Sequence, residues 1–247
     1  MALASLFESS LLEHSLLFAS CYGSAALLVL HTSSPLRCLR YGKLAPTWAV
    51  LRHECLYCAC SIVIASFYDA IIHWDVETGA GWTNVHRRLD RFSYSFSIMG
   101  VVGAALLAEA HFFWTHRLMH WSTWLYVNVH KVHHVSHDPN PLSGISFHPI
   151  EGGVYFSSVL LGAFLLPMNL SFFRAWRTAL FLAPIGGHLG LGTARVWPLH
   201  MVSHYHHIHH TKVHCNYGGF ILWDWLCGTT YDDWRRREID TKRAVST

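Results

Sequence analysis

Charged side chains are scarce in this chain. Lys, Arg, Asp and Glu together make up 13% of the 247 residues, whereas a soluble domain carries about 25%. Hydrophobic residues reach 52%. This deficit of charge predicts a membrane protein before any motif is considered.

The chain also lacks a basic stripe. Its net charge is only +3, and the basic residues are scattered around apolar segments. They form no continuous basic surface that could bind along a phosphate backbone. Nucleic acid is therefore a poor candidate partner. No internal repeat, low-complexity segment or long linker is visible, and the length suits one catalytic unit.

The seven cysteines do not demand a disulfide framework. Their number is odd, and Cys55, Cys58 and Cys60 lie inside an apolar run, LYCACSIVIA. A thiolate site is one interpretation of these three residues. We favour the other, in which they are small apolar residues buried in a membrane helix.

Long apolar runs are present instead, each near the roughly 20 residues that cross a bilayer. They predict three membrane spans, at about residues 11–31, Trp48–Ile72 and Tyr94–Phe113. The first run follows Glu8 and not a basic region, so we interpret it as a span and not as a cleavable signal peptide.

A fourth apolar stretch, Val154–Gly190, is interrupted at Pro167. Each half is short for a full span, so we predict a helical hairpin that dips into the bilayer and returns. The distribution of basic residues predicts that the Arg37–Lys43 loop and Arg235–Arg237 face the cytosol, with the acidic N-terminus outside. Arg87, Arg88 and Arg91 fall on the opposite side and argue against this orientation.

Histidine is present in clear excess, with 21 copies. A buried imidazole must be hydrogen-bonded or ligated, so packing does not explain why a hydrophobic chain collects this residue. Neutral imidazole is the commonest metal ligand in proteins. The excess therefore predicts metal binding, and most of the histidines form clusters after Ala110.

Three clusters carry this prediction. They are HRLMH with His116 and His120, HKVHH with His130, His133 and His134, and HHIHH with His206, His207, His209 and His210. Positions i, i+3 and i+4 share one face of a helix, so each spacing is expected to direct two or three imidazoles to one point. Eight imidazoles exceed the four ligands of a zinc site, so we predict two metal ions. Imidazole suits Zn, Cu, Fe and Ni, and the ligand set alone does not choose among them.

The boxes HxxxH, HxxHH and HxxHH resemble the eight-histidine signature of the sterol desaturase/fatty acid hydroxylase superfamily. FHPIEG, at residues 147–152, is similar to an element of sterol C5-desaturases. HHIHHTKVHCNYGGF followed by LWDWLCGTTY resembles the end of that family's domain. The similarity covers roughly residues 100–235. It selects His206, His209 and His210 in the third box, and His188 in GGHLG matches an additional histidine of the family.

This resemblance implies two iron ions, cycling between Fe2+ and Fe3+, with dioxygen as co-substrate. Electrons would come from NAD(P)H through a separate donor such as cytochrome b5, because the chain contains no HPGG-type segment of its own. The expected reaction is hydroxylation or desaturation of a C–H bond in a lipid, a sterol or another hydrophobic substrate such as a terpenoid or polyketide. The expected location is the endoplasmic reticulum membrane, among membrane lipids, with the boxes facing the cytosol.

The fold that follows is all-α, an integral membrane helical bundle with a histidine-rich di-metal cap at the cytosolic face. We expect spans and loops in residues 1–99, the fatty acid hydroxylase/sterol desaturase-like catalytic domain in 100–235, and a polar tail in 236–247.

Two carboxylates are candidates for supporting the ligands. Glu109 lies seven residues before His116 and nearly on its helical face, and an ionisable group inside a span is a functional candidate. The alternative is a polar face turned toward neighbouring helices. Asp224, in WDWLCGT, is either a second supporting residue or a turn-forming residue near Gly228.

Other polar residues receive structural interpretations. His148 is expected to cap a turn before Pro149 or to support the ligands, and the flanking His204, His207 and His214 are left out of the ligand set. Asn216, Tyr217 and Gly218 are expected to shape the loop after the third box. The scattered histidines are predicted to be non-ligands: His14, His31, His53, His73 and His86.

Two alternative functions were considered. A membrane zinc hydrolase would use a general-base carboxylate, as in HExxH, but HRLMH has Arg117 in that place. A non-enzymatic metal carrier would hold ionisable groups at the midplane of broken helices, whereas these histidines gather beyond the spans. We therefore favour the oxygenase.

Overall fold

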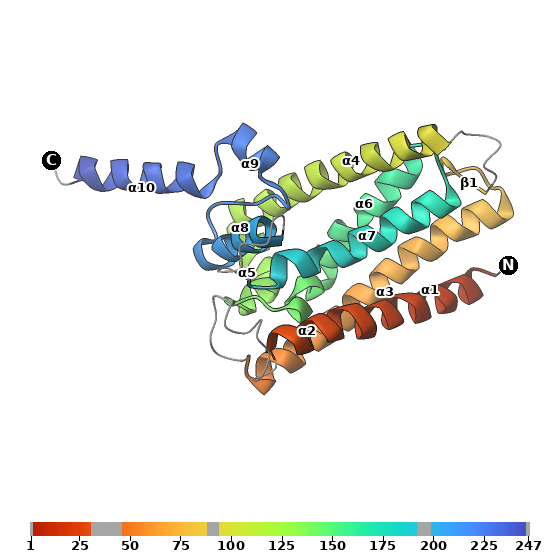
Figure 1. Ribbon diagram of the computed structural model, residues 1–247, viewed down its shortest axis with the longest axis horizontal. Helices are drawn as coiled ribbons and strands as arrows, with labels where there is room; N and C mark the ends of the chain where they lie inside the picture. Colours follow the sequence, from red (N-terminus) through yellow and green to blue (C-terminus); the bar gives the residue numbers. More distant parts are fainter. Residues whose placement is uncertain (1, 31–45, 88–93, 192–198, 246–247) are drawn as a thin grey trace.

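The computed structural model describes residues 2–30, 46–87, 94–191 and 199–245. Long helices lie side by side along one axis of the molecule, and short helices cover one end of them (Figure 1). The only strands in this described part are two residues each. The predicted fold class, an all-α membrane bundle, is therefore confirmed.

Three helices are long and apolar enough to cross a membrane. The first runs from Leu3 to Leu30 and consists of α1 (Leu3–Leu17), a π-helical segment η1 (Phe18–Tyr22) and α2 (Gly23–Leu30). The other two are α3 (Trp48–Thr78) and α4 (Tyr94–Trp121). All three extend beyond the apolar runs that predicted them, because the backbone stays helical past the hydrophobic stretch and into polar residues.

The predicted hairpin is formed by α6 (Pro149–Leu165) and α7 (Leu170–His188). His148 and Asn169 cap their first turns by accepting hydrogen bonds from Ile150 N and Ser171 N, and Pro167 lies in the turn between them. The tip reaches the far end of the bundle. There β2 (Met168–Asn169) pairs in parallel with β1 (Val85–His86), so the hairpin extends further than a shallow dip would. Its depth in a bilayer stays a prediction.

Close helix contacts position the hairpin. A Cβ added at Gly162 of α6 would lie 2.5 Å from Cη2 of Trp176 on α7, so only glycine permits this approach. Gly100 of α4 lies similarly against the Pro167 carbonyl at the hairpin tip. The hairpin is therefore packed against α4 along one side and α3 along the other.

A buried ion-pair network ties α7 to the first two spans. Arg177 Nη2 lies 2.6 Å from Glu13 Oε2 of α1, and Arg177 Nε lies 3.1 Å from Asp69 Oδ1 of α3. Asp69 also accepts a 2.7 Å hydrogen bond from Ser10 Oγ. On the next turn of α7, Arg174 Nε donates to His73 Nε2 over 2.9 Å. The Arg177–Asp69 pair is buried inside the bundle, whereas Glu13 and Arg174 lie at its surface.

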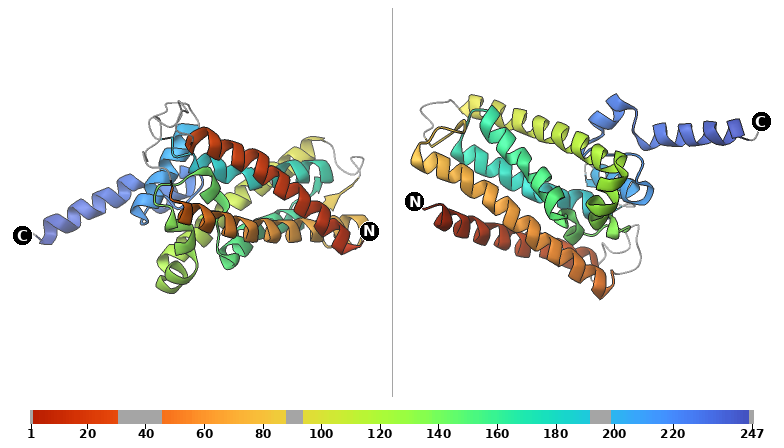
Figure 2. Two further views of the ribbon diagram at one scale, coloured as in Figure 1. Left: turned by 90° about the horizontal axis from the view of Figure 1, so that it is seen from below. Right: turned by 180° about the vertical axis from the view of Figure 1, so that it is seen from behind.

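The end of the bundle opposite the N-terminus carries the remaining elements (Figures 1 and 2). They are α5 (Thr123–Asn128), η4 (His130–Val135), η5 (Pro141–Ile145), α8 (Leu199–Lys212), α9 (Ile221–Cys227) and α10 (Tyr231–Val245). The last helix projects away from the bundle in every view, and Arg235–Arg237 lie on it. The Arg37–Lys43 loop, Arg88 and Arg91 lie outside the described residues, so the orientation in the membrane stays a prediction.

Candidate metal centre

Nine histidines form two groups whose ligand nitrogens lie within 4.8 Å of one another in each group. The first group contains His116, His120, His130, His134 and His209. The second contains His133, His188, His206 and His210. These nine are the residues singled out from the sequence, and of them only His120 is not fully buried. Their role as metal ligands stays a prediction.

Each box directs two imidazoles to one group, as expected, but the third imidazole of each HxxHH box belongs to the other group. In η4, His130 and His134 belong to the first group while His133 belongs to the second. In α8, His206 and His210 belong to the second group while His209 belongs to the first. Residues four apart share a face, but the residue between them points to the neighbouring group. Each HxxHH box therefore spans both groups.

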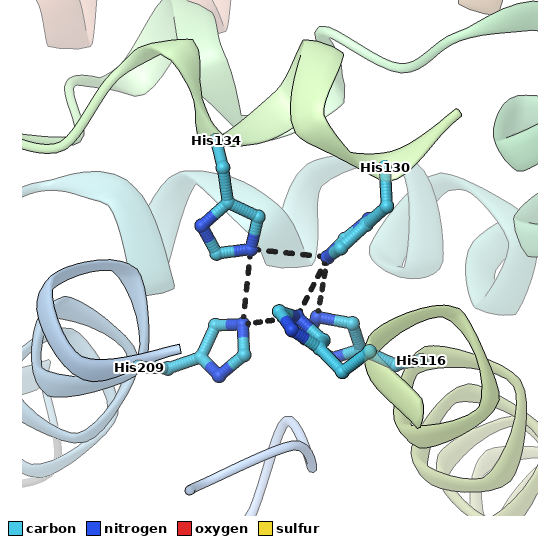
Figure 3. Close-up of side chains that lie close together, drawn as sticks. His116, His130, His134 and His209 are labelled. Carbon is cyan, nitrogen blue, oxygen red and sulfur yellow. Dashed lines mark hydrogen bonds between the residues drawn. The ribbon is translucent and has the colours of Figure 1, made fainter. Parts of the chain in front are cut away.

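In the first group the Nε2 atoms converge (Figure 3). His130 Nε2 lies 3.1 Å from that of His116, 2.9 Å from that of His120 and 3.0 Å from that of His134. His209 Nε2 completes the ring, at 3.1 Å from His120 and 3.2 Å from His134. Five imidazoles from three separate elements thus face one point.

The outer nitrogens of three of these rings are already engaged. His116 Nδ1 donates to the Tyr217 carbonyl over 2.6 Å, and His209 Nδ1 donates to the Cys215 carbonyl over 2.8 Å. His130 Nδ1 lies 2.7 Å from Glu151 Oε1. In a neutral imidazole only one nitrogen carries the proton. Because these contacts hold the proton on Nδ1, the three Nε2 atoms are unprotonated and their lone pairs point toward one another.

The second group has the same construction. His188 Nε2 lies 3.4 Å from His133 Nε2 and 3.1 Å from His206 Nε2. The Nε2 atoms of His206 and His210 lie 3.0 Å apart. Outside the group, His188 Nδ1 donates to the Pro184 carbonyl and His210 Nδ1 to the Ser136 carbonyl.

The two groups adjoin. The rings of His134 and His210 have centroids 4.5 Å apart, and each of these residues belongs to a different group. Two ions held by the two groups would therefore be neighbours.

Burial keeps these imidazoles neutral. It holds the pKa values of His130, His133 and His134 well below the ordinary 6.5, and the like charge that each ring would meet from its neighbours lowers them further. The same holds for His206, His209 and His210. Converging neutral lone pairs repel one another unless a cation lies between them, so the donor set fits metal ions.

The spacing also bears on the coordination number. With metal–nitrogen distances of about 2.1 Å, ligands at right angles lie about 3.0 Å apart and tetrahedral ligands about 3.4 Å apart. The distances between neighbouring Nε2 atoms are 2.9 to 3.2 Å in the first group and 3.0 to 3.4 Å in the second. The five imidazoles of the first group exceed the four ligands of a tetrahedral zinc site.

Glu109 and Asp224 act on one loop, residues 215–220, and not on an imidazole. Glu109 Oε1 accepts a 2.8 Å hydrogen bond from Phe220 N. The fully buried Asp224 accepts from Tyr217 N, at 2.9 Å, and from Gly218 N, at 2.7 Å. The same loop offers the carbonyls that accept from His116 and His209, so any effect of these carboxylates on the ligands would pass through its backbone.

Glu151 has a contact that the sequence reasoning missed. The reasoning quoted FHPIEG for its resemblance but gave its acid no role. Glu151 is 5% exposed and its Oε1 meets His130 Nδ1, while no hydrogen-bond partner is found for its Oε2. Carboxylate–histidine contacts commonly orient metal ligands, and a buried acid 21 residues from a histidine box is the signal that was available.

The other histidines of the described residues belong to neither group. His148 caps α6. His14 and His73 belong to the ion-pair region, and His53 Nε2 lies 3.2 Å from the Val132 carbonyl. His31 lies outside the described residues. The residues Asn216, Tyr217 and Gly218 form the loop described above, and Asn216 Oδ1 accepts from Tyr231 N.

A cavity of about 340 Å³ leads to the histidines. It runs between α4, α6 and α7, and its walls are mostly apolar, as with Ala105, Phe112 and Leu180. Histidines of both groups line one part of it: His116, His130, His133, His188 and His206. An apolar molecule in this cavity would meet both groups at once.

The chain was compared with known proteins. The family model "fatty acid hydroxylase" matches residues 101–229, just over half of the chain. No solved structure gives a significant match.

Several curated relatives are similar to the chain. An Arabidopsis thaliana protein named as a candidate Delta(7)-sterol-C5(6)-desaturase is 30% identical, over 60% of this chain and 54% of its own length. An Arabidopsis thaliana methylsterol monooxygenase is 30% identical, over 50% of this chain and 49% of the length of that protein. A rice very-long-chain aldehyde decarbonylase is 29% identical, over 56% of this chain and 54% of the length of that protein. The chain spans about half the length of these relatives, and the family match identifies it as a member of the fatty acid hydroxylase family, within the sterol desaturase/fatty acid hydroxylase superfamily.

Proposed function

We propose that this chain is a membrane di-iron oxygenase that hydroxylates or desaturates a C–H bond of a lipid-like substrate. The observation that carries the proposal is the pair of adjoining all-imidazole groups beside an apolar cavity. The names of the relatives, which include desaturases, monooxygenases and decarbonylases, support a lipid as the substrate class.

The two reactions differ in their products but share their inputs. In hydroxylation, a C–H bond, dioxygen, two electrons and two protons give an alcohol and one water. In desaturation, two hydrogens leave adjacent carbons and the same inputs give an alkene and two waters. When bound, two iron ions supply the reductive activation of dioxygen that such C–H oxidation needs.

The nine histidines would hold the ions. The contacts from the Tyr217, Cys215, Pro184 and Ser136 carbonyls and from Glu151 fix the proton on Nδ1 and thereby present Nε2. Ligands held in this way keep their geometry when the oxidation state changes. The five imidazoles of the first group exceed the four ligands of a tetrahedral zinc site, which supports a metal that takes more ligands, such as iron.

The cavity would orient the substrate and exclude water. Its walls are apolar and its histidine-lined part brings a carbon atom of the substrate to both groups. Exclusion of water matters because a reactive oxidant would otherwise be consumed without product. The electrons would come from NAD(P)H through a separate protein such as cytochrome b5, and the location would be the endoplasmic reticulum membrane with the histidine end in the cytosol.

The test uses the full chain in microsomes with a reductant system and dioxygen, followed by lipid profiling by mass spectrometry. We expect a product heavier by one oxygen atom or lighter by two hydrogen atoms. It should disappear without oxygen and in His133→Ala, and it should persist in His214→Ala, a matched histidine outside both groups.

Metal analysis of the same protein completes the test. Two irons per chain are expected. A chain that holds only zinc and forms no oxygen-dependent product would overturn the proposal and favour a hydrolase or a metal carrier.

A further inference from the structure

Helix α9 is built with its polar side inward. Asp224 is fully buried and holds the 215–220 loop. The outward residues are instead large and apolar, with Trp225 68% and Phe220, just before the helix, 63% exposed. The full apolar set, here called the α9 face, is Phe220, Ile221, Leu222, Trp225 and Leu226. Such a face is stable in water only if something apolar covers it.

The position of α9 along the third span indicates what covers it. Trp223 stacks on Phe113 of α4, with ring centroids 6.1 Å apart, and meets Trp114 at 6.4 Å. Phe113 lies nineteen residues beyond Tyr94, where α4 begins. At 1.5 Å per residue this is about 28 Å, close to the roughly 30 Å of a bilayer's hydrocarbon core. Helix α9 therefore lies at the level of the membrane boundary.

The neighbouring residues have the composition of such a boundary. Trp114, Trp121 and Trp124 are exposed at the end of α4 and in α5, and tryptophan is enriched at membrane interfaces. The Arg117 guanidinium lies over the rings of Phe113 and Trp114, at 5.9 and 5.7 Å. A cation over aromatic rings beside an apolar face is suited to lipid headgroups.

The same place borders the cavity. Phe220 and Gly219 line it, as do Glu109, Ala108 and Ala105 of α4. Phe220 is thus both a cavity wall and a member of the exposed α9 face. Glu109 lies about one helical turn before Phe113, on the side toward the start of the span, so this part of the cavity wall lies just within the hydrocarbon.

We propose that α9 is an interfacial helix whose apolar face lies in the bilayer, and that the contact between α4 and residues 219–220 is the lateral entrance of the cavity. The ligand that enters is a membrane lipid, taken from the boundary between headgroups and acyl chains. The entrance rests on the proposed function, whereas the seating of α9 in the bilayer does not.

The seating is tested with the purified full chain in lipid nanodiscs. Tryptophan emission is recorded with ordinary lipids and with lipids brominated on the acyl chain, for the wild type, Trp225→Phe and Trp234→Phe. The emission of each variant is subtracted from that of the wild type, and the difference is the emission of the tryptophan that was replaced. The Trp225 emission should fall at least about twofold with brominated lipid, because interfacial helices bury their apolar face about 5–10 Å deep.

Trp234 is the matched control, because it lies on the charged helix α10, where Lys212 Nζ approaches its ring to 5.8 Å. Its emission should stay unquenched. Both substitutions keep an aromatic ring, so both variants are expected to fold. Unquenched Trp225 emission would overturn the proposal.

The entrance is tested by photocrosslinking in the same nanodiscs. The photoreactive residue p-benzoylphenylalanine replaces Phe220 or, as control, Ile239 on α10, which is also exposed. After illumination, mass spectrometry should find lipid adducts at 220 and not at 239. Adducts of position 220 to a second copy of the chain, or no lipid adduct, would contradict the entrance. Neither readout needs turnover, so failure here is distinguishable from failure of the proposed oxygenase.

Discussion

Two of the buried polar clusters in the described part of this bundle are built on different rules. Around Arg177, each charge faces an opposite charge, and Ser10 donates a hydrogen bond to Asp69. Around His130, rings of one kind face one another with their unprotonated nitrogens. The first cluster is complete without a ligand. The donor set of the second fits the cations proposed above.

The sharpest test of this contrast removes one imidazole. His209→Ala takes away a nitrogen of the first group, and we expect loss of bound metal there and of oxygen-dependent activity. His214→Ala, a change of the same kind outside both groups, should leave metal content and activity unaltered. Metal analysis and product assays check both. Full metal loading of His209→Ala would show that the group is not a metal site.

A change in the ion-pair network should lower the free energy of unfolding and leave the metal content unchanged. Arg177→Met leaves Asp69 buried without its cation, and breaking such a pair costs about 3–5 kcal/mol. Thermal unfolding in detergent measures the loss. The exposed neighbour Arg174→Met is the control and should cost much less. If the folded fraction of Arg177→Met lacked metal, the two clusters would not be independent.

Glu151 tests whether a carboxylate supports the ligands through His130. Glu151→Gln retains the shape of the side chain but weakens the hydrogen bond that it accepts from His130 Nδ1. Outer partners of this kind are worth about 10–100-fold in metal affinity, which competition with a chelator measures. An unchanged affinity would assign Glu151 to packing alone.

The smallest effects concern the apolar contacts between the clusters. Gly162→Ala forces α6 away from Trp176 and should destabilise the fold by about 1–3 kcal/mol. Gly186→Ala on α7 meets nothing within 4 Å and should stabilise it by about 0.5–1 kcal/mol, since glycine weakens a helix interior. Opposite shifts in thermal unfolding are expected. Equal shifts would mean that α6 and α7 tolerate separation from each other.

The sequence reasoning succeeded where information is local or carried by family motifs. Apolar runs located the three spans, and the boxes located eight of the nine clustered histidines, with His188 added by resemblance. It failed where contacts are distant in the chain. The division of each HxxHH box between two groups depends on how η4 and α8 face each other. The contact of Glu151 with His130, and that of Glu109 with Phe220, likewise join segments that no spacing rule connects.

The division of the boxes has a mechanical consequence. Because α8 carries His209 for one group and His206 and His210 for the other, a rotation of this single helix moves donors of both groups together. The same is true of η4. Helices α4 and α7 each carry donors of one group only, but α8 and η4 carry donors of both, so a metal held by one group would fix the donors that these two elements offer to the other. Assembly of the centre is therefore expected to be cooperative, with few half-loaded molecules at any metal supply.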